Sequence, residues 1–218
     1  MKTPEFLTVL DRLRQEYPSW QTPSVTLIAA TKRDPFRVLL STVLSLRTKD
    51  EITLPASERL FALAPDAVAL QAVPADVIEK AIYPVAFFRN KARSLRAIAA
   101  ELLEKYDGEV PADLEVLLTL PGVGRKTANL VMSLGHNLPA VCVDVHVHRI
   151  CNRLDFVRSK TPEETEFAIR RKLPRNHWIE LNDILVAFGQ TICRPVSPFC
   201  SKCPVTEQCP KRHVEKHR

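Results

Sequence analysis

Residues 120–129 read Leu120-Pro-Gly-Val-Gly-Arg-Lys-Thr-Ala-Asn129, and they predict a tight turn between two helices. The chain has only five glycines, and two of them, Gly122 and Gly124, lie in this segment. Glycine permits a positive φ angle and leaves the neighbouring backbone N–H groups uncovered. Helical patterns precede the turn at residues 113–118 and follow it at residues 125–134. The segment therefore indicates a helical fold around this turn.

The same turn is a candidate anion site. The backbone N–H groups of Gly122, Val123 and Gly124 would point at an anion beside the N-terminus of the following helix, and a phosphate of nucleic acid fits that description. The adjacent Arg125 and Lys126 add positive charge at this point. A tight turn that binds no ligand is the alternative.

Apolar residues recur at intervals of three and four along most of the chain, for example in residues 36–46, 92–103 and 184–188. This period predicts amphipathic helices, and recurring prolines are typical of short helices with short connections. Residues 140–145 alternate as a strand would, but their helical neighbours favour the start of a helix. We therefore predict an all-α fold of two helical lobes, joined at residues 17–23 and 137–141.

Four of the six cysteines form a cluster, Cys193-x6-Cys200-x2-Cys203-x5-Cys209. The N-terminal residues contain no apolar run of signal-peptide length, which favours metal binding over disulfides. Zinc sites usually contain two close cysteine pairs, whereas this cluster has one with wide gaps on either side. A larger metal centre suits that spacing, which does not name the metal. The other two cysteines, Cys142 and Cys151, are expected to be buried small apolar residues.

The bulk composition narrows the class of protein. Lys and Arg total 31 against 25 Asp and Glu, so the net charge of +6 is compatible with a polyanionic partner. Aromatic residues make up only 6% of the chain, which argues against an aromatic platform for single-stranded RNA. No apolar stretch approaches the roughly 20 residues that cross a bilayer. We expect a monomer without membrane association, located in the cytoplasm and, in a prokaryote, at the nucleoid.

Three motifs together resemble the helix-hairpin-helix DNA glycosylases, and among them the endonuclease III family. They are the turn at residues 120–129, the segment Val143-Asp-Val-His-Val-His-Arg149 and the cysteine cluster. The resemblance extends from about Val38 to Cys209. It implies base excision repair by a bifunctional glycosylase and AP lyase, which acts on double-stranded DNA with damaged, in particular oxidised, pyrimidines or abasic sites.

The resemblance also implies an architecture and a cofactor. Residues 28–137 would form a six-helix barrel domain that contains the helix-hairpin-helix. Residues 1–27 and 138–218 would form a second domain, with DNA bound in the cleft between the two. In the second domain, a [4Fe-4S] cluster would be held by Cys193, Cys200, Cys203 and Cys209.

The family's catalytic pair falls on Lys126 and Asp144. A lysine amine attacks C1′ of the sugar only when it is neutral, and the helix N-terminus and Arg125 both disfavour positive charge at Lys126. Asp144 would accept a proton from the amine or stabilise the positive charge that grows on the sugar. The resulting Schiff base would allow β-elimination to nick the strand 3′ to the lesion. The alternatives are an exposed surface lysine and a helix N-cap aspartate.

Three further candidates depart from the family pattern. Arg47 stands where endonuclease III commonly has glutamine, and Phe87 stands where it commonly has leucine. A guanidinium or a phenyl ring can fill the gap that a flipped-out base leaves in the stack; an ordinary surface arginine and a core phenylalanine are the alternatives. Arg194 is a single cation in the loop between Cys193 and Cys200, where the family often has more for contact with phosphate.

The sequence is also compatible with two competing functions. One is a monofunctional mismatch, uracil or adenine glycosylase of the same superfamily, against which Lys126 argues because such enzymes usually lack this lysine. The other is a non-catalytic iron–sulfur regulator that uses the hairpin only to bind the phosphates of undamaged DNA.

Overall fold

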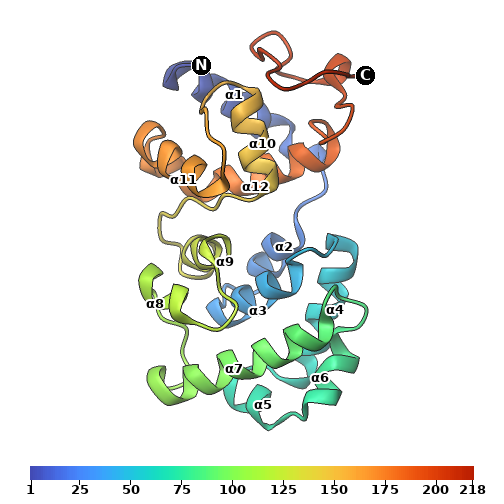
Figure 1. Cartoon of the computed structure of the whole chain (residues 1–218), viewed down its shortest axis with the longest axis vertical. Helices are drawn as coiled ribbons and strands as arrows, with labels where there is room; N and C mark the ends of the chain where they lie inside the picture. Colours follow the sequence, from blue (N-terminus) through green and yellow to red (C-terminus); the bar gives the residue numbers. More distant parts are fainter. The chain divides into compact units, whose positions relative to one another are not determined.

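The computed structural model describes all 218 residues, and every regular element in it is helical (Figure 1). The all-α prediction is therefore confirmed. The chain divides into two compact units. We call Met1–Pro23 together with Pro139–Arg218 the terminal unit, and Ser24–Leu138 the central unit. None of the helices is both long and apolar enough to span a membrane.

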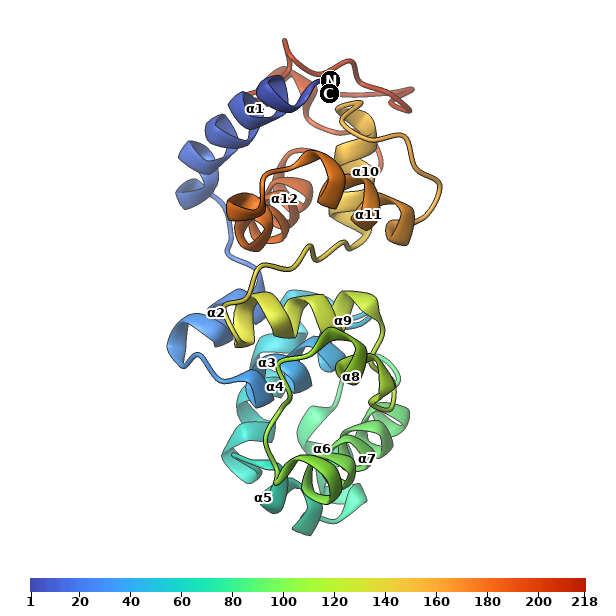
Figure 2. The ribbon, with the colours of Figure 1, turned by 90° about the vertical axis from the view of Figure 1, so that its left-hand side faces the viewer.

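The central unit (Figure 2) is built around α3 (Pro35–Ser45), most of whose residues are buried. Asp34 caps its N-terminus by accepting hydrogen bonds from the N–H groups of Phe36 and Arg37. The buried hydroxyl of Thr42 donates to the carbonyl of Val38 at 2.6 Å, so this hydroxyl has its hydrogen-bond partner within the helix. The other elements of this unit are α2 (Ser24–Thr31), α4 (Asp50–Leu63), α5 (Ala67–Ala72), α6 (Ala75–Ile82), α7 (Phe88–Tyr106), α8 (Leu114–Thr119), α9 (Arg125–Leu130) and the π-helical turn η2 (Val131–Gly135).

Packing on α3 positions several other elements of this unit. Helices α2, α4, α7 and α9 all contact α3, and the turn η2 packs against it as well. The turn η2 lies close to the start of α3, because a Cβ added to Gly135 would lie 3.0 Å from Cα of Pro35. The hairpin helix α9 and the long helix α7 are thus both seated on the same buried helix.

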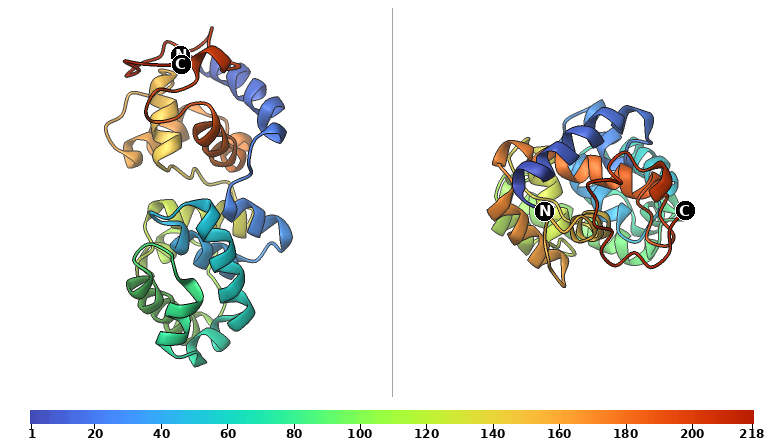
Figure 3. Two further views of the ribbon diagram at one scale, coloured as in Figure 1. Left: turned by 90° about the vertical axis from the view of Figure 1, so that its right-hand side faces the viewer. Right: turned by 90° about the horizontal axis from the view of Figure 1, so that it is seen from above.

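The terminal unit takes helices from both ends of the chain. They are α1 (Thr3–Glu16), η1 (Tyr17–Ser19), α10 (Val145–Arg153), α11 (Pro162–Lys172), η3 (Arg175–His177), α12 (Trp178–Thr191) and η4 (Cys200–Lys202). Helix α12 contacts both α1 and α10, and Figure 3 shows α1 beside the C-terminal segments. Phe6 of α1 stacks on Phe156, with ring centroids 3.7 Å apart and planes 9° from parallel. Residues remote in sequence thus share one apolar core.

The chain passes between the units at Pro23–Ser24 and Leu138–Pro139, in the segments expected to join two lobes. Residues 24–27, which the sequence analysis assigned to the N- and C-terminal domain, instead begin α2 of the central unit. Residues 140–144 form neither strand nor helix, and α10 begins only at Val145. The expected helix start is therefore right, but it lies at the end of the alternating segment.

Candidate functional site

The turn at residues 120–129 is a helical hairpin between α8 and α9, as the sequence predicts. Gly122 has a φ angle of +75°, a conformation that side chains rarely adopt. Gly124 is exposed, caps α9 and would have open space around an added Cβ. Val123 is different, because its N–H donates to the carbonyl of Leu120 at 3.1 Å and its side chain is buried. The prediction that all three N–H groups face an anion is therefore wrong for Val123, which anchors the turn.

Lys126 is the second residue of α9, in its first turn, where the sequence places it. Four residues of the same helix after Lys126, from Thr127 to Leu130, are buried and hold the helix in place. The carbonyl of Arg125 accepts a hydrogen bond from the side-chain amide of Asn129 at 2.9 Å. The amine of Lys126 is thus carried by a helix that is fixed on its buried face.

Asp144 is the N-cap of α10 in the terminal unit. Its Oδ1 accepts hydrogen bonds from the N–H groups of His146 at 2.8 Å and Val147 at 2.9 Å. The N-cap alternative is thus confirmed as a structural fact about Asp144. The cap fixes the position of the Asp144 carboxylate, and a carboxylate fixed in this way is compatible with a catalytic role.

The structure brings Arg47 and Phe87 together. The guanidinium carbon of Arg47 lies 4.9 Å from the centroid of the Phe87 ring. Both residues have a φ angle of 57°, in the left-handed region, and both are exposed. The alternative of a core phenylalanine is wrong, because the Phe87 residue is 56% exposed. Two candidates that are 40 positions apart in the sequence therefore form one exposed cation–π pair.

Lys91 lies one helical turn after Phe87 on α7 and was not among the predicted site residues. Only 7% of the residue is exposed, and its ammonium donates hydrogen bonds to the carbonyls of Leu44 at 2.8 Å and Leu46 at 2.6 Å. Burial lowers its pKa to about 8. The sequence contains a signal for it, because Lys91 occupies the same apolar stripe of α7 as Leu95 and Ile98.

The four clustered cysteines line one pocket in the terminal unit. Apolar residues share this lining, among them Ile150, Leu154, Phe188, Ile192 and Val205. Burial raises the pKa of the Cys203 thiol to about 11, and the nearby thiolates of Cys193, Cys209 and Cys200 raise it further. Burial likewise raises the pKa of Cys200 and Cys209. A cationic centre in this pocket would remove the repulsion among the thiolates.

The arrangement of the donors distinguishes among metal centres. No group of three or more His, Cys, Asp or Glu side chains is placed to hold a single metal ion. A polynuclear centre spreads four thiolates over several metal atoms, so thiols spaced around a shared pocket fit it better. Nη1 of Arg153 lies 3.4 Å from Sγ of Cys193 and supplies positive charge beside the donors. Cys142 and Cys151 are buried elsewhere in this unit, as expected.

Two arginines of α10 hold the first cysteine and the loop after it. Nη2 of Arg149 donates to the carbonyls of Cys193 at 2.9 Å and Gly189 at 3.2 Å. The guanidinium of Arg153 donates to the carbonyls of Arg194 and Pro195, both at 2.7 Å. The exposed side chain of Arg194 itself donates to the carbonyl of Gln190 and lies 5.2 Å from the Phe199 ring.

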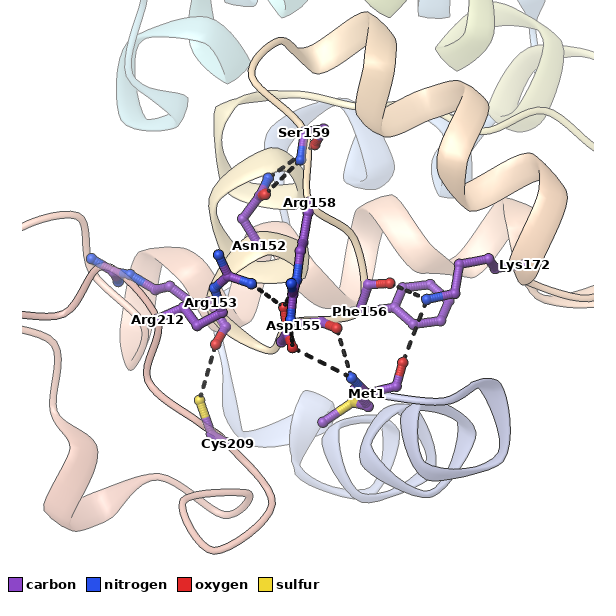
Figure 4. Close-up of polar contacts among 10 residues, drawn as sticks. All are labelled: Met1, Asn152, Arg153, Asp155, Phe156, Arg158, Ser159, Lys172, Cys209 and Arg212. Atoms are coloured by element: carbon purple, nitrogen blue, oxygen red, sulfur yellow. Dashed lines mark hydrogen bonds and ion pairs between the residues drawn. The ribbon is translucent and has the colours of Figure 1, made fainter.

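The last cysteine is tied to the loop after α10 (Figure 4). The N–H of Arg212 donates to the carbonyl of Arg153 at 3.1 Å, and Sγ of Cys209 lies 3.8 Å from the same oxygen. The side chain of Arg212 pairs with Asp155, which also accepts hydrogen bonds from Arg158 at 2.8 and 3.1 Å. These two arginines hold the pKa of Asp155 well below its ordinary value.

Residues 40–175 match the model of the HhH-GPD superfamily of base excision DNA repair proteins. The chain belongs to this superfamily. Within the HhH-GPD superfamily it is 49% identical over 178 residues to Endonuclease III of Thermotoga maritima, a match that covers 81% of this chain and 83% of that protein. It is 40% identical over 225 residues to the chloroplastic Endonuclease III homolog 2 of Arabidopsis thaliana, covering 95% of this chain but 58% of that longer protein.

Solved structures agree with this membership. The chain matches Endonuclease III in a non-covalent DNA complex with a TM-score of 0.86 and 33% identity, over 97% of this chain and 96% of that one. A trapped covalent Endonuclease III–DNA intermediate matches with the same score and identity, over 97% of each chain. The HhH-GPD fold therefore extends beyond the residues of the family model to nearly the whole chain.

Proposed function

We propose that the chain is a base excision repair DNA glycosylase with AP lyase activity, of the endonuclease III type. The likeness to the Endonuclease III chain trapped in a covalent DNA intermediate carries this conclusion, since it covers 97% of this chain. A covalent intermediate with DNA requires a nucleophile. Lys126 lies in the first turn of α9 on the hairpin of this chain, and a lysine amine can form a Schiff base with a sugar carbon. The substrate that we propose is duplex DNA with an oxidised pyrimidine or an abasic site.

We assign the nucleophilic role to Lys126 and the carboxylate role to Asp144. As the glycosidic bond breaks, the base leaves with its electron pair and takes up a proton, while Nζ of Lys126 forms a bond to C1′. Opening of the sugar ring gives a Schiff base, whose positive charge acidifies the proton at C2′. Loss of that proton then expels the 3′ phosphate and nicks the strand. Asp144 stabilises the positive charge on the sugar or accepts the amine proton.

The remaining residues bind and deform the DNA. Gly122, Gly124 and Arg125 offer the hairpin turn to a backbone phosphate, with the uncrowded Gly124 allowing close approach. Arg47 and Phe87 fill the gap in the stack after extrusion of the damaged base. Arg194 provides a further phosphate contact.

The cysteine pocket would hold a [4Fe-4S] cluster through Cys193, Cys200, Cys203 and Cys209. The donor set supports this assignment, because four thiols and an apolar lining surround one pocket. When bound, the cluster supplies a covalent brace for the C-terminal segment rather than a step of the reaction. Arg149 and Arg153 orient Cys193 within that brace.

Borohydride trapping tests the proposal. The wild-type protein should form a covalent adduct with a duplex that carries an abasic site or an oxidised pyrimidine, and Lys126→Ala should reduce that adduct to background. Lys105→Ala is the matched control, because Lys105 is an exposed lysine of α7 that forms an ion pair with Glu101, one turn earlier on the same helix. An adduct that persists in Lys126→Ala would remove Lys126 from the nucleophilic role.

The same panel of duplexes separates the alternatives. A monofunctional glycosylase would release the base and leave an abasic site that breaks only on heating in alkali. A non-catalytic regulator would bind undamaged DNA and turn nothing over. Nicked product formed without heat or alkali excludes both.

A further inference from the structure

The Arg47–Phe87 pair stands on two short loops with unusual backbone conformations. Arg47 follows the C-terminus of α3, and Phe87 is the N-cap of α7. Left-handed backbone at a residue other than glycine is strained and persists only where the surroundings determine it. Something in the structure must therefore hold both loop tips in place.

Lys91 is placed to hold the first loop. Its ammonium accepts no hydrogen bond and has three donors, and it donates to the carbonyls of Leu44 and Leu46 at the end of α3. The last carbonyls of a helix have no partner within the helix, and a cation at this end also interacts favourably with the helix dipole. The third hydrogen bond goes to Oγ1 of Thr48 at 3.2 Å. Lys91 thus fixes the residues on both sides of Arg47.

The same residue is connected to the second loop. The backbone N–H of Lys91 donates to the carbonyl of Phe87 at 3.0 Å, which makes Phe87 part of the first turn of α7. The hydroxyl of Thr48 also accepts a hydrogen bond from the N–H of Ala86 at 3.2 Å. The backbone on both sides of Arg47, and the backbone of Phe87 and of the residue before it, are therefore joined through Lys91 and Thr48.

We propose that Lys91 is a positioning residue for base extrusion, which holds Arg47 and Phe87 at the spacing in which they enter the DNA stack. Lys91 has this role only if the chain is the glycosylase proposed above. Because the ammonium is buried and bonded to the backbone and hydroxyl of the first loop, it acts on DNA through the two loops and not by contact. Two tips held in advance avoid the entropy cost of ordering both loops at the moment of insertion.

The test compares two substrates that differ in the need for base extrusion. Lys91→Met keeps the length of the side chain and removes its donors, and Lys105→Met on the same helix is the matched control. Lys91→Met should slow single-turnover excision of a fully paired lesion by about tenfold to a hundredfold, the cost of misplaced groups. Nicking at a preformed abasic site should fall less than about threefold, because no base must be unpaired there.

Fluorescence provides a second readout that a purely structural role would not move. A 2-aminopurine opposite the lesion should report the filling of the stack when wild type or Lys105→Met binds, and this signal should be lost with Lys91→Met. Thr48→Val, which removes only the shared hydroxyl, should shift the ratio of the two rates in the same direction by a smaller factor. If Lys91→Met does not fold, this variant decides.

The outcomes distinguish the proposed function from the positioning role of Lys91. A wild-type protein that neither excises nor nicks overturns the proposed function itself. An active wild type whose Lys91→Met or Thr48→Val variant loses both rates by the same factor, with an unchanged fluorescence signal, overturns the positioning role alone. A selective loss of excision supports it.

Discussion

Asp144 combines a negative charge and a helix cap in one side chain. Its Oδ1 accepts the N–H groups of His146 and Val147 at the start of α10. The cap needs an acceptor oxygen, whereas the proposed chemistry needs a negative charge. A side-chain amide supplies the first and not the second.

Asp144→Asn and Asp144→Ala should therefore separate the two roles. Asparagine caps a helix about as well as aspartate, so Asp144→Asn should unfold at nearly the wild-type temperature. Its base excision should still fall by about 10²–10⁴-fold, the usual contribution of a general acid or base. Asp144→Ala should lose the same activity and, in addition, about 0.5–2 kcal/mol of stability.

The check is thermal unfolding beside single-turnover excision for both variants. Wild-type excision by Asp144→Asn would show that Asp144 is only a cap. A large loss of stability in Asp144→Asn would show instead that its charge, and not its acceptor oxygen, holds the start of α10.

Single residues of the site differ in how far the sequence reveals them. Lys126 and Gly122 lie where the motif places them, because the hairpin is local and glycine marks the positive φ angle. The hydrogen bond from the N–H of Val123 to Leu120 could not be predicted from the sequence, because it depends on which face of the turn is buried. Lys91 was missed because a buried lysine looks the same in a sequence as an exposed one unless its apolar stripe is examined.

The elements of the site include two loops that only the fold brings together. The sequence suggested Arg47 and Phe87 one at a time, by comparison with a family pattern. Their stacking at 4.9 Å results from the packing of α7 on α3, which is not encoded in either loop. Substitution of one residue should therefore affect the other.

Arg47→Gln and Phe87→Leu restore the residues common in the family, and they should change the preference for the base opposite the lesion. A guanidinium stacked on a ring is worth about 0.5–1 kcal/mol at an exposed site, so the ratio of rates between opposite bases should change by about twofold to fivefold. The measurement is excision of one lesion opposite each of the four bases. Equal rates opposite all four bases in wild type and in both variants would contradict this role.

The loop after α10 is a second element whose order depends on charge. Asp155 pairs with Arg158 and Arg212, and this pairing keeps its pKa below the ordinary value of 3.8. A carboxylate with a depressed pKa stabilises the fold above its unfolded pKa and loses this effect as the pH falls towards the folded value. Asp155→Asn should therefore lower the melting temperature at pH 7.

Acid should reduce that difference. Below about pH 4 the unfolded state takes up a proton at Asp155 while the folded state keeps the charge, so the stabilisation declines as the pH falls towards the depressed folded pKa, and the melting temperatures of wild type and Asp155→Asn should draw closer. Thermal unfolding at pH 7 and pH 3 in low salt measures this. Asp76→Asn is the control, because that exposed aspartate of α6 pairs with Lys80 on the surface. A difference that stays constant with pH would contradict the ion-pair explanation.

At the scale of the whole molecule, local patterns predicted the elements better than their partners. A period of 3.6 residues is visible within one helix, so the all-α class and the positions of α8, α9 and α12 followed from the sequence. The contact of α1 with α12 and the stacking of Phe6 on Phe156 join distant parts of the chain. No local pattern encodes such contacts, and only the resemblance to a family pointed to a domain built from both ends of the chain.

The C-terminal stretch of the terminal unit has little regular structure of its own. Its regular structure after α12 is the short turn η4. Val205 is buried, but few other apolar side chains of this stretch are. Hydrogen bonds tie it to α10 through Arg153 and to its own loop through the backbone of Arg218. A stretch with so small an apolar core needs a further constraint to remain ordered, and four thiolates on one centre would provide it.

Cys203→Ala should therefore remove both the cofactor and the order of this stretch. The wild-type protein should show a visible absorption band near about 410 nm, typical of thiolate-bound iron, and Cys203→Ala should lose it. Limited proteolysis should then cut after α12 while fragments of the central unit survive, because that unit has its own core around α3. Cys142→Ala is the matched control, since Cys142 is buried away from the pocket and should keep the band. A band that survives Cys203→Ala, or that disappears with Cys142→Ala, would show that the brace is not where the four cysteines place it.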